Sequence, residues 1–146
     1  MDDNSRNIDQ SLLSAYLRTT YQVEQPAIQI HIGRSSRALQ ALLQKFGATS
    51  WVFITAWNPK SILLSQKEND ARHEKLVEMV EKRGFPFFIG YGIGADDTWQ
   101  PEQSLLILGI PQKEAINLGQ QFQQHAIVFG TADGLPELVF CQGFGV

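Results

Sequence analysis

The sequence predicts a single α+β domain built on a mixed or antiparallel sheet, and three observations predict it. From residue 51 onward, apolar strand patterns and amphipathic helix patterns follow in the order strand, helix, strand, strand, helix, strand. That order is typical of a split βαβ, or ferredoxin-like, core. Residues 51–57 form a continuous apolar and β-branched run, as expected of a strand buried on both faces. A length of 146 residues suits one domain with its own hydrophobic core.

Segments on either side are predicted to extend this core. A helix, a strand and a second helix precede it, and one more strand follows it. The domain is expected to span residues 9–146, with a disordered polar N-terminus over residues 1–8. The alternative fold is a three-layer α/β sandwich, because the additional helices can cover the other face of the sheet.

The first elements follow from periodicity and from residues that begin or end helices. Apolar positions recur at helical spacing over residues 12–20, and Asp9 is the expected N-cap. Alternation over residues 27–32 predicts a strand. A second amphipathic helix is expected over residues 38–46, because Gly47 stands where a left-handed C-terminal residue belongs.

Within the core, a capping box from Ser65 to Glu68 predicts a helix that runs to about Arg83. The remaining predicted elements are strands over residues 85–93 and 104–110, a helix that begins at Pro111, and strands over residues 126–129 and 138–140. The last two strands are expected to pair as a hairpin across a turn at residues 132–134.

Composition and charge argue against several classes of partner. With 12 Lys and Arg residues against 15 Asp and Glu residues, the net charge of −3 lacks the cationic surface that nucleic acids require. The single cysteine, Cys141, excludes an internal disulfide and a cysteine-rich metal site, and it fits a reducing cytoplasm. No apolar run approaches about 20 residues, and no signal-peptide pattern is present. We expect a cytoplasmic protein with neither a nucleic-acid nor a membrane partner.

Polar residues follow the buried strand at the edge where open sheets bind ligands. Trp57 and Asn58 end the run, and Asn69 and Arg72 share one face of the next helix near its start. If that helix starts beside the end of the strand, Asn58, Asn69 and Arg72 converge on a carboxylate or phosphate group. In the structural alternative, Asn58 caps a turn and Arg72 pairs with Asp70 or a neighbouring carboxylate.

Other combinations of reactive residues are less specific. His73 could serve as a general base, but no Ser or Cys nucleophile lies in a recognisable motif. Three scattered histidines favour structural roles over metal ligation. The spacing of Asp96, Asp97 and Glu102 matches no calcium loop. We therefore expect no metal and no cofactor.

The run from Ile54 to Pro59, Ile-Thr-Ala-Trp-Asn-Pro, resembles the bacterial proteins grouped as the domain of unknown function 3293 family. Further residues that carry the resemblance are Ser65, Glu68, Asn69 and Arg72, then Trp99, Glu102 and Ser104, Leu108-Gly109, Leu118-Gly119 with Phe122, and residues 136–139. The resemblance covers the chain from about Tyr16 to Val139. It implies a cytoplasmic protein and brings no assigned activity, cofactor or catalytic residue.

Several of these residues have no local structural explanation, and we expect them to line one pocket at the carboxyl edge of strand 51–57. The predicted pocket residues are Trp57, Asn58, Asn69, Arg72, Trp99, Glu102 and Glu137. Three functions stay open: binding or sensing of a small anionic ligand through Arg72, protein interaction or assembly, and an enzyme of unknown reaction. In the enzyme, Glu102, Glu137 or His73 would be the acid or base. The oligomeric state also stays open.

Overall fold

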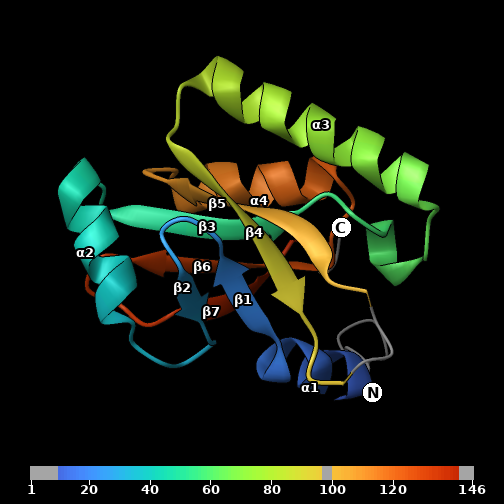
Figure 1. Ribbon diagram of the computed structural model, residues 1–146, viewed down its shortest axis with the longest axis horizontal. Helices are drawn as coiled ribbons and strands as arrows, with labels where there is room; N and C mark the ends of the chain where they lie inside the picture. The colour runs from blue at the N-terminus through green and yellow to red at the C-terminus, as the bar shows by residue number, and fades with distance from the viewer. Residues whose placement is uncertain (1–9, 97–99, 142–146) are drawn as a thin grey trace, which may run out of the picture.

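The computed structural model describes residues 10–96 and 100–141, which contain four α-helices and a seven-stranded sheet (Figure 1). The helices are α1 (Gln10–Arg18), α2 (Arg37–Phe46), α3 (Gln66–Arg83) and α4 (Gln112–Gln121), and η2 (Pro59–Ser61) is a short 3-10 turn. The strands are β1 (Thr20–Val23), β2 (Ile28–Ile30), β3 (Ser50–Thr55), β4 (Phe87–Ile93), β5 (Glu102–Leu108), β6 (Ala126–Thr131) and β7 (Glu137–Phe140). The predicted α+β class is confirmed.

The sheet has the strand order β2-β1-β4-β5-β3-β6-β7, and every neighbouring pair is antiparallel. It curls into a half-barrel, and its two edges approach each other at one end. There the backbone N–H of Gly33, after β2, donates to the carbonyl of Pro136, before β7, at 2.9 Å. The predicted hairpin between the last two strands is confirmed by the pairing of β6 with β7.

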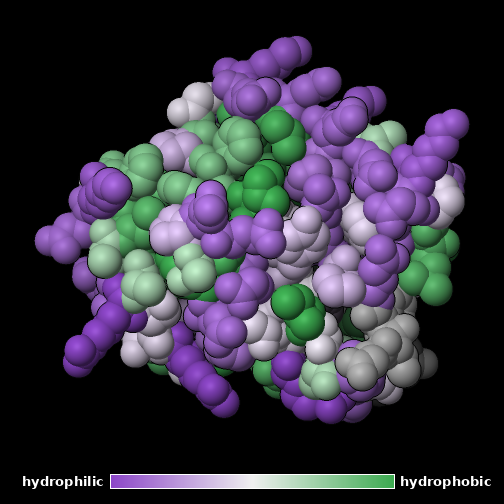
Figure 2. All heavy atoms as spheres, viewed as in Figure 1, coloured by the Kyte–Doolittle hydropathy of each residue, from purple (hydrophilic) through white to green (hydrophobic). Residues whose placement is uncertain are grey.

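Strand β3 is buried on both faces, as its apolar run predicts. Val52 and Ile54 belong to one hydrophobic cluster together with residues of α3 and α4, whereas Trp51 and Phe53 belong to a second cluster with residues of α2. Figure 1 shows α3 and α4 on the same side of the sheet. The outer surface of α3 is hydrophilic (Figure 2), because its apolar side chains face the sheet.

Side-chain and glycine caps set the ends of α2 and α3, and the sequence predicts two of them, Gly47 after α2 and the capping box of α3. The Ser36 hydroxyl accepts a backbone N–H from the first turn of α2, and Gly47 ends that helix in the left-handed region, with φ 65°. Ser65 and Glu68 form the expected capping box of α3, and Gly84 ends it with φ 78°.

The N-terminal extension differs from the prediction. Instead of helix, strand, helix, it contains α1, the β1–β2 hairpin and α2. Helix α1 ends at Arg18, and Thr20 already belongs to β1, where Tyr21 and Val23 turn their side chains into the core. A strand of four residues offers too little alternation to be distinguished from the end of a helical stripe. The expected N-cap, Asp9, lies outside the described residues.

Two glycines of β4 provide a direct test of the sheet packing. A Cβ atom on Gly90 would lie 2.5 Å from the backbone oxygen of Gln22 and 2.9 Å from the Phe53 ring, whereas a Cβ on Gly92 would meet nothing within 4 Å. We expect Gly90→Ala to lower the free energy of unfolding by about 1–3 kcal/mol, because backbone must move to admit the methyl group. Gly92→Ala, the matched control, should change it by less than about 0.5 kcal/mol. Urea denaturation measures both, and equal losses would contradict this account.

Candidate functional site

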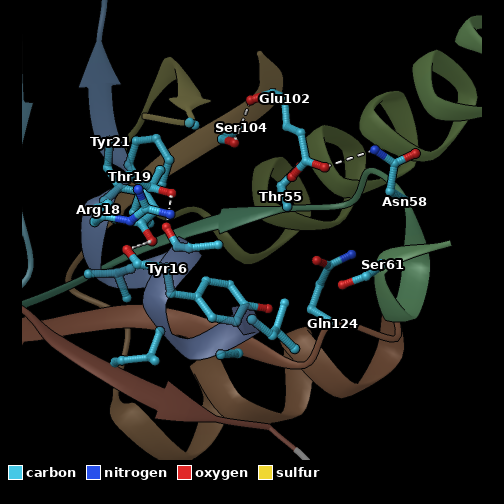
Figure 3. A pocket seen from close by; sticks show the side chains of 18 of the residues that line it. Tyr16, Arg18, Thr19, Tyr21, Thr55, Asn58, Ser61, Glu102, Ser104 and Gln124 are labelled. Atoms are coloured by element: carbon cyan, nitrogen blue, oxygen red, sulfur yellow. Dashed lines mark hydrogen bonds between the residues drawn. The ribbon is translucent and has the colours of Figure 1, made fainter. Parts of the chain in front are cut away.

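A pocket of about 250 Å³ lies between α1 and the face of the sheet opposite α3 and α4 (Figure 3). Its apolar lining includes Leu12, Ala15, Tyr16, Tyr21, Phe53, Val128 and Leu138. Its polar lining includes Arg18, Thr55, Asn58, Ser61, Asp96, Glu102, Ser104 and Gln124. The pocket therefore combines an aromatic body with a polar end, the usual composition of a small-molecule site.

The polar end forms where β3 stops beside the start of β5. Thr55 and Ser104 are cross-strand partners, so their side chains lie on the same face of the sheet and reach the pocket together. The Thr55 hydroxyl donates to the carbonyl of Gln103 at 2.7 Å and accepts the backbone N–H of Trp57 at 3.1 Å. These bonds turn the chain out of the sheet and deliver Asn58 to the wall of the pocket.

Asn58 is held by hydrogen bonds on every side. Its backbone has φ 46° and ψ 66°, a left-handed conformation that asparagine tolerates better than most residues. Its backbone N–H donates to Oδ1 of Asn69 at 2.9 Å, and its own Oδ1 accepts from Nδ2 of Asn69 and from the N–H of Leu64, both at 3.0 Å. Since that oxygen is occupied, the amide nitrogen must face Glu102, and it donates to Oε2 at 2.8 Å.

Asn69, Asn58 and Glu102 thus form one hydrogen-bonded chain that ends at a carboxyl in the pocket wall. Figure 3 shows its last bond, from Asn58 to Glu102. Burial raises the pKa of the Glu102 carboxyl above its usual range, and the hydrogen bond from Asn58 opposes part of that rise. Burial also raises the pKa of Tyr16, and the nearby charge of Glu102 adds to the effect. Tyr16 therefore keeps its hydroxyl proton at neutral pH.

Replacing Glu102 with glutamine should reveal the raised pKa as a pH dependence of stability. A carboxyl whose pKa is higher in the folded chain loses stabilisation as the pH rises from its unfolded value to its folded value. We expect the free energy of unfolding of the wild type, relative to Glu102→Gln, to fall as the pH rises above about 4.5 and then to level off. Urea denaturation of both proteins between about pH 4 and pH 8 tests this. A difference that rises with pH would show that the Asn58 bond outweighs burial.

Gln124 enters the pocket from the segment between α4 and β6. The residue is 7% exposed, and Nε2 of its side chain donates to the carbonyls of Trp57 at 3.0 Å and Phe122 at 3.2 Å. Because both nitrogen bonds lie on one side of the amide, Oε1 is directed away from these carbonyls. Figure 3 shows this amide reaching toward the part of the pocket that holds the Glu102 carboxyl.

Arg72 lies behind the pocket and is not among its lining residues. Its Nε donates to the carbonyl of Ala56 at 2.6 Å, and a terminal nitrogen donates to the carbonyl of Phe122. The guanidinium also stands 5.8 Å from the centre of the Phe122 ring. Arg72 therefore ties the segment after β3 to the end of α4, and it shares the Phe122 carbonyl with Gln124.

The other residues expected in the pocket differ in whether they line it. Trp57 is buried without lining the pocket, and its indole nitrogen has no hydrogen-bond partner among the described residues. Glu137 is exposed at the start of β7 and is likewise not among the lining residues, whereas Trp99 lies outside the described residues. Of the seven residues, Asn58 and Glu102 line the pocket and Asn69 supports them.

Several lining residues carry no functional pattern in the sequence. Tyr16 appears there as part of the apolar stripe of a helix, and Gln124 and Ser61 belong to no motif.

In residues 10–96 and 100–141, no group of three or more His, Cys, Asp and Glu side chains is arranged to hold a metal ion. His73 is buried, which lowers its pKa, and its Nδ1 has no partner in the same part of the chain.

The model of the family described as "Protein of unknown function (DUF3293)" matches residues 54–127. The chain belongs to this family. The match runs from the end of β3 to the start of β6, so Asn58, Asn69, Glu102 and Gln124 lie within the DUF3293 region, whereas Tyr16 and the rest of α1 precede it. No curated protein and no solved structure matches the chain. No helix in the described ranges is long and apolar enough to cross a membrane.

Proposed function

We propose that this protein binds a small molecule in the pocket between α1 and the sheet, with Glu102 orienting the ligand. The carrying observation is the chain Asn69–Asn58–Glu102, which holds a carboxyl at the wall of a preformed cavity. A network that serves folding alone normally satisfies its own polar groups. The Asn69–Asn58–Glu102 network instead ends at the Glu102 carboxyl, whose only side-chain hydrogen-bond partner among the described residues is Asn58.

The backbone beside this carboxyl supports a functional role. Three of the four residues at positions 58–61 are non-glycine residues with positive φ, namely Asn58 at 46°, Lys60 at 53° and Ser61 at 62°. Such conformations cost free energy and cluster at ligand sites, where the surrounding structure enforces them. Here the strained turn brings both Asn58 and Ser61 to the pocket.

We also propose that β3, α3, β4, β5, α4 and β6 are a ferredoxin-like core. The strand order β4-β5-β3-β6 supports this. Helix α3 connects β3 to β4, with β5 between them in the sheet, and α4 connects β5 to β6, with β3 between them. The pocket would then lie at the carboxyl end of β3, on the face of the sheet that the two core helices do not cover.

A second candidate is an enzyme that uses Glu102 as a general acid or base. Its raised pKa favours this, because buried pocket carboxyls with raised pKa values are suited to proton transfer near neutral pH. The hydroxyl of Tyr16 offers a second proton donor in the same pocket. Conversion of a bound compound in solution, measured by NMR, separates an enzyme from a binding module.

A thermal-shift screen tests the proposed binding. Ligands that bind the native state must raise the melting temperature. The control is Gly92→Leu, because Gly92 lines the pocket and a Cβ there would meet nothing within 4 Å, so a leucine side chain would take up part of the ligand's space. We expect compounds to stabilise the wild type and not this variant. If no compound raises the melting temperature, a protein-interaction or assembly domain is favoured, and equal stabilisation of both proteins would place binding elsewhere.

A further inference from the structure

We infer that the ligand of this pocket is a small organic cation with N–H donors, such as an amine, amidine or guanidine, attached to a flat apolar body. The inference rests on the proposed function, since it assigns the chemistry of a ligand at the same site. It differs from the anionic ligand that the sequence suggests, and three features of the pocket carry it.

The first feature is the orientation of Gln124, whose amide nitrogen donates twice and whose amide oxygen has no hydrogen bond to a described residue. Both of its side-chain hydrogen bonds to described residues run from Nε2 to main-chain carbonyls. Among the described residues, only the indole nitrogen of Trp57 and Nδ1 of His73 are fully buried side-chain polar atoms without a partner. Oε1 of Gln124 is therefore not sealed in the core, although its residue is 7% exposed, and it faces the pocket that Gln124 lines. It can only accept a hydrogen bond.

The second feature is the carboxyl of Glu102 on the same side of the pocket. Asn58 can only donate to it, because Oδ1 of Asn58 is occupied by two other donors. The bond from Asn58 engages Oε2, and in the ionised carboxyl Oε1, which has no hydrogen bond to a described residue, can accept from a ligand. Glu102 is thus held by Asn58 and Gln124 by two main-chain carbonyls, and both side chains reach the same part of the pocket (Figure 3).

The third feature is the charge of the lining. Among the described residues that line the pocket, the acidic side chains are Glu102 and Asp96 and the basic side chain is Arg18. Figure 3 places Arg18 beside Thr19 and Tyr21, away from the polar end that contains Glu102. Arg72 is occupied by two main-chain carbonyls behind the wall. An anion at the polar end would therefore face a carboxyl without an opposing cation.

The apolar end explains the body of the ligand. The rings of Tyr21 and Phe53 line the pocket with their centroids 5.3 Å apart in an edge-to-face arrangement, and Tyr16 stands beside them. Aromatic faces attract organic cations and stack on flat groups. A ring with a cationic nitrogen group would place the ring there and direct its N–H groups to Glu102 and Gln124.

Benzamidine, benzamide and benzoate form a probe set of nearly equal size that is cationic, neutral and anionic. We would measure their dissociation constants at pH 7 by isothermal titration calorimetry and locate them by NMR shifts. We expect benzamidine to bind at least about tenfold more tightly than benzoate. Glu102→Gln should weaken benzamidine by about tenfold or more and change benzamide by less than about threefold. The matched control is Glu137→Gln, because this exposed glutamate changes the net charge equally outside the pocket.

The outcomes separate this inference from the proposed function. Benzoate that binds in the pocket as tightly as benzamidine overturns the cationic class and leaves small-molecule binding intact. An equal loss in Glu102→Gln and Glu137→Gln also overturns it, since net charge alone would then act. If none of the three probes binds, the hits of the thermal-shift screen decide: amines or guanidines support the inference, and carboxylates or phosphates overturn it. An absence of hits contradicts the proposed function.

Discussion

Asn58→Ala should lower the free energy of unfolding by about 3–5 kcal/mol, one of the two largest effects expected in this protein. The variant loses the side-chain bonds to Glu102, Asn69 and the N–H of Leu64. It leaves buried polar groups unpaired, and it forces alanine into the left-handed backbone that asparagine tolerates. Urea denaturation monitored by tryptophan fluorescence measures the loss.

Asn58→Gly is the matched control for the backbone contribution. It removes the same side-chain bonds, but glycine adopts the left-handed conformation without steric cost. We expect it to be about 1 kcal/mol more stable than Asn58→Ala and still clearly less stable than the wild type. A loss below about 1 kcal/mol in both variants would contradict the central role assigned to the Asn69–Asn58–Glu102 chain.

Arg72→Ala should lower the free energy of unfolding by about 2–4 kcal/mol, because it leaves two main-chain carbonyls without their charged donor. Arg72→Lys should recover only part of this loss, since an ammonium group cannot reproduce the planar fork that reaches both Ala56 and Phe122. Chemical denaturation measures both variants.

The same variants separate a structural role of Arg72 from a ligand-binding role. Because Arg72 does not line the pocket, we expect the affinity for benzamidine to stay within about threefold of the wild type in Arg72→Lys. A variant with unchanged stability and a lost ligand response would instead place Arg72 in the binding site. That result would favour the anionic ligand.

Much of the fold follows from local patterns. The caps of α2 and α3 and the burial of β3 on both faces were predictable, because each depends on neighbouring residues and their spacing. β1 was not predictable, since its four residues form a strand only through pairing with β2 and β4. Pairing partners lie far apart in the sequence and leave little local trace.

The candidate site was predictable in part. The convergence expected of Asn58 and Asn69 is present, because a short connection after β3 places the start of α3 beside its end. Glu102 joins them because β5 pairs with β3 and starts where β3 stops. Gln124 and Tyr16 could not be recognised, since an isolated glutamine and a helical tyrosine have no distinguishing spacing.

Residue order and spacing were sufficient to identify the α+β class, the buried strand and the Asn-Pro turn that ends it. They were also sufficient to mark Asn58, Asn69 and Arg72 as polar residues in need of partners. The choice of partners came from the folded chain. In the folded chain, Arg72 donates hydrogen bonds to two main-chain carbonyls, whereas the Asn58 amide donates to the carboxyl of Glu102. Hydrogen bonds act over about 3 Å, so their pattern depends on the tertiary packing that brings distant segments together.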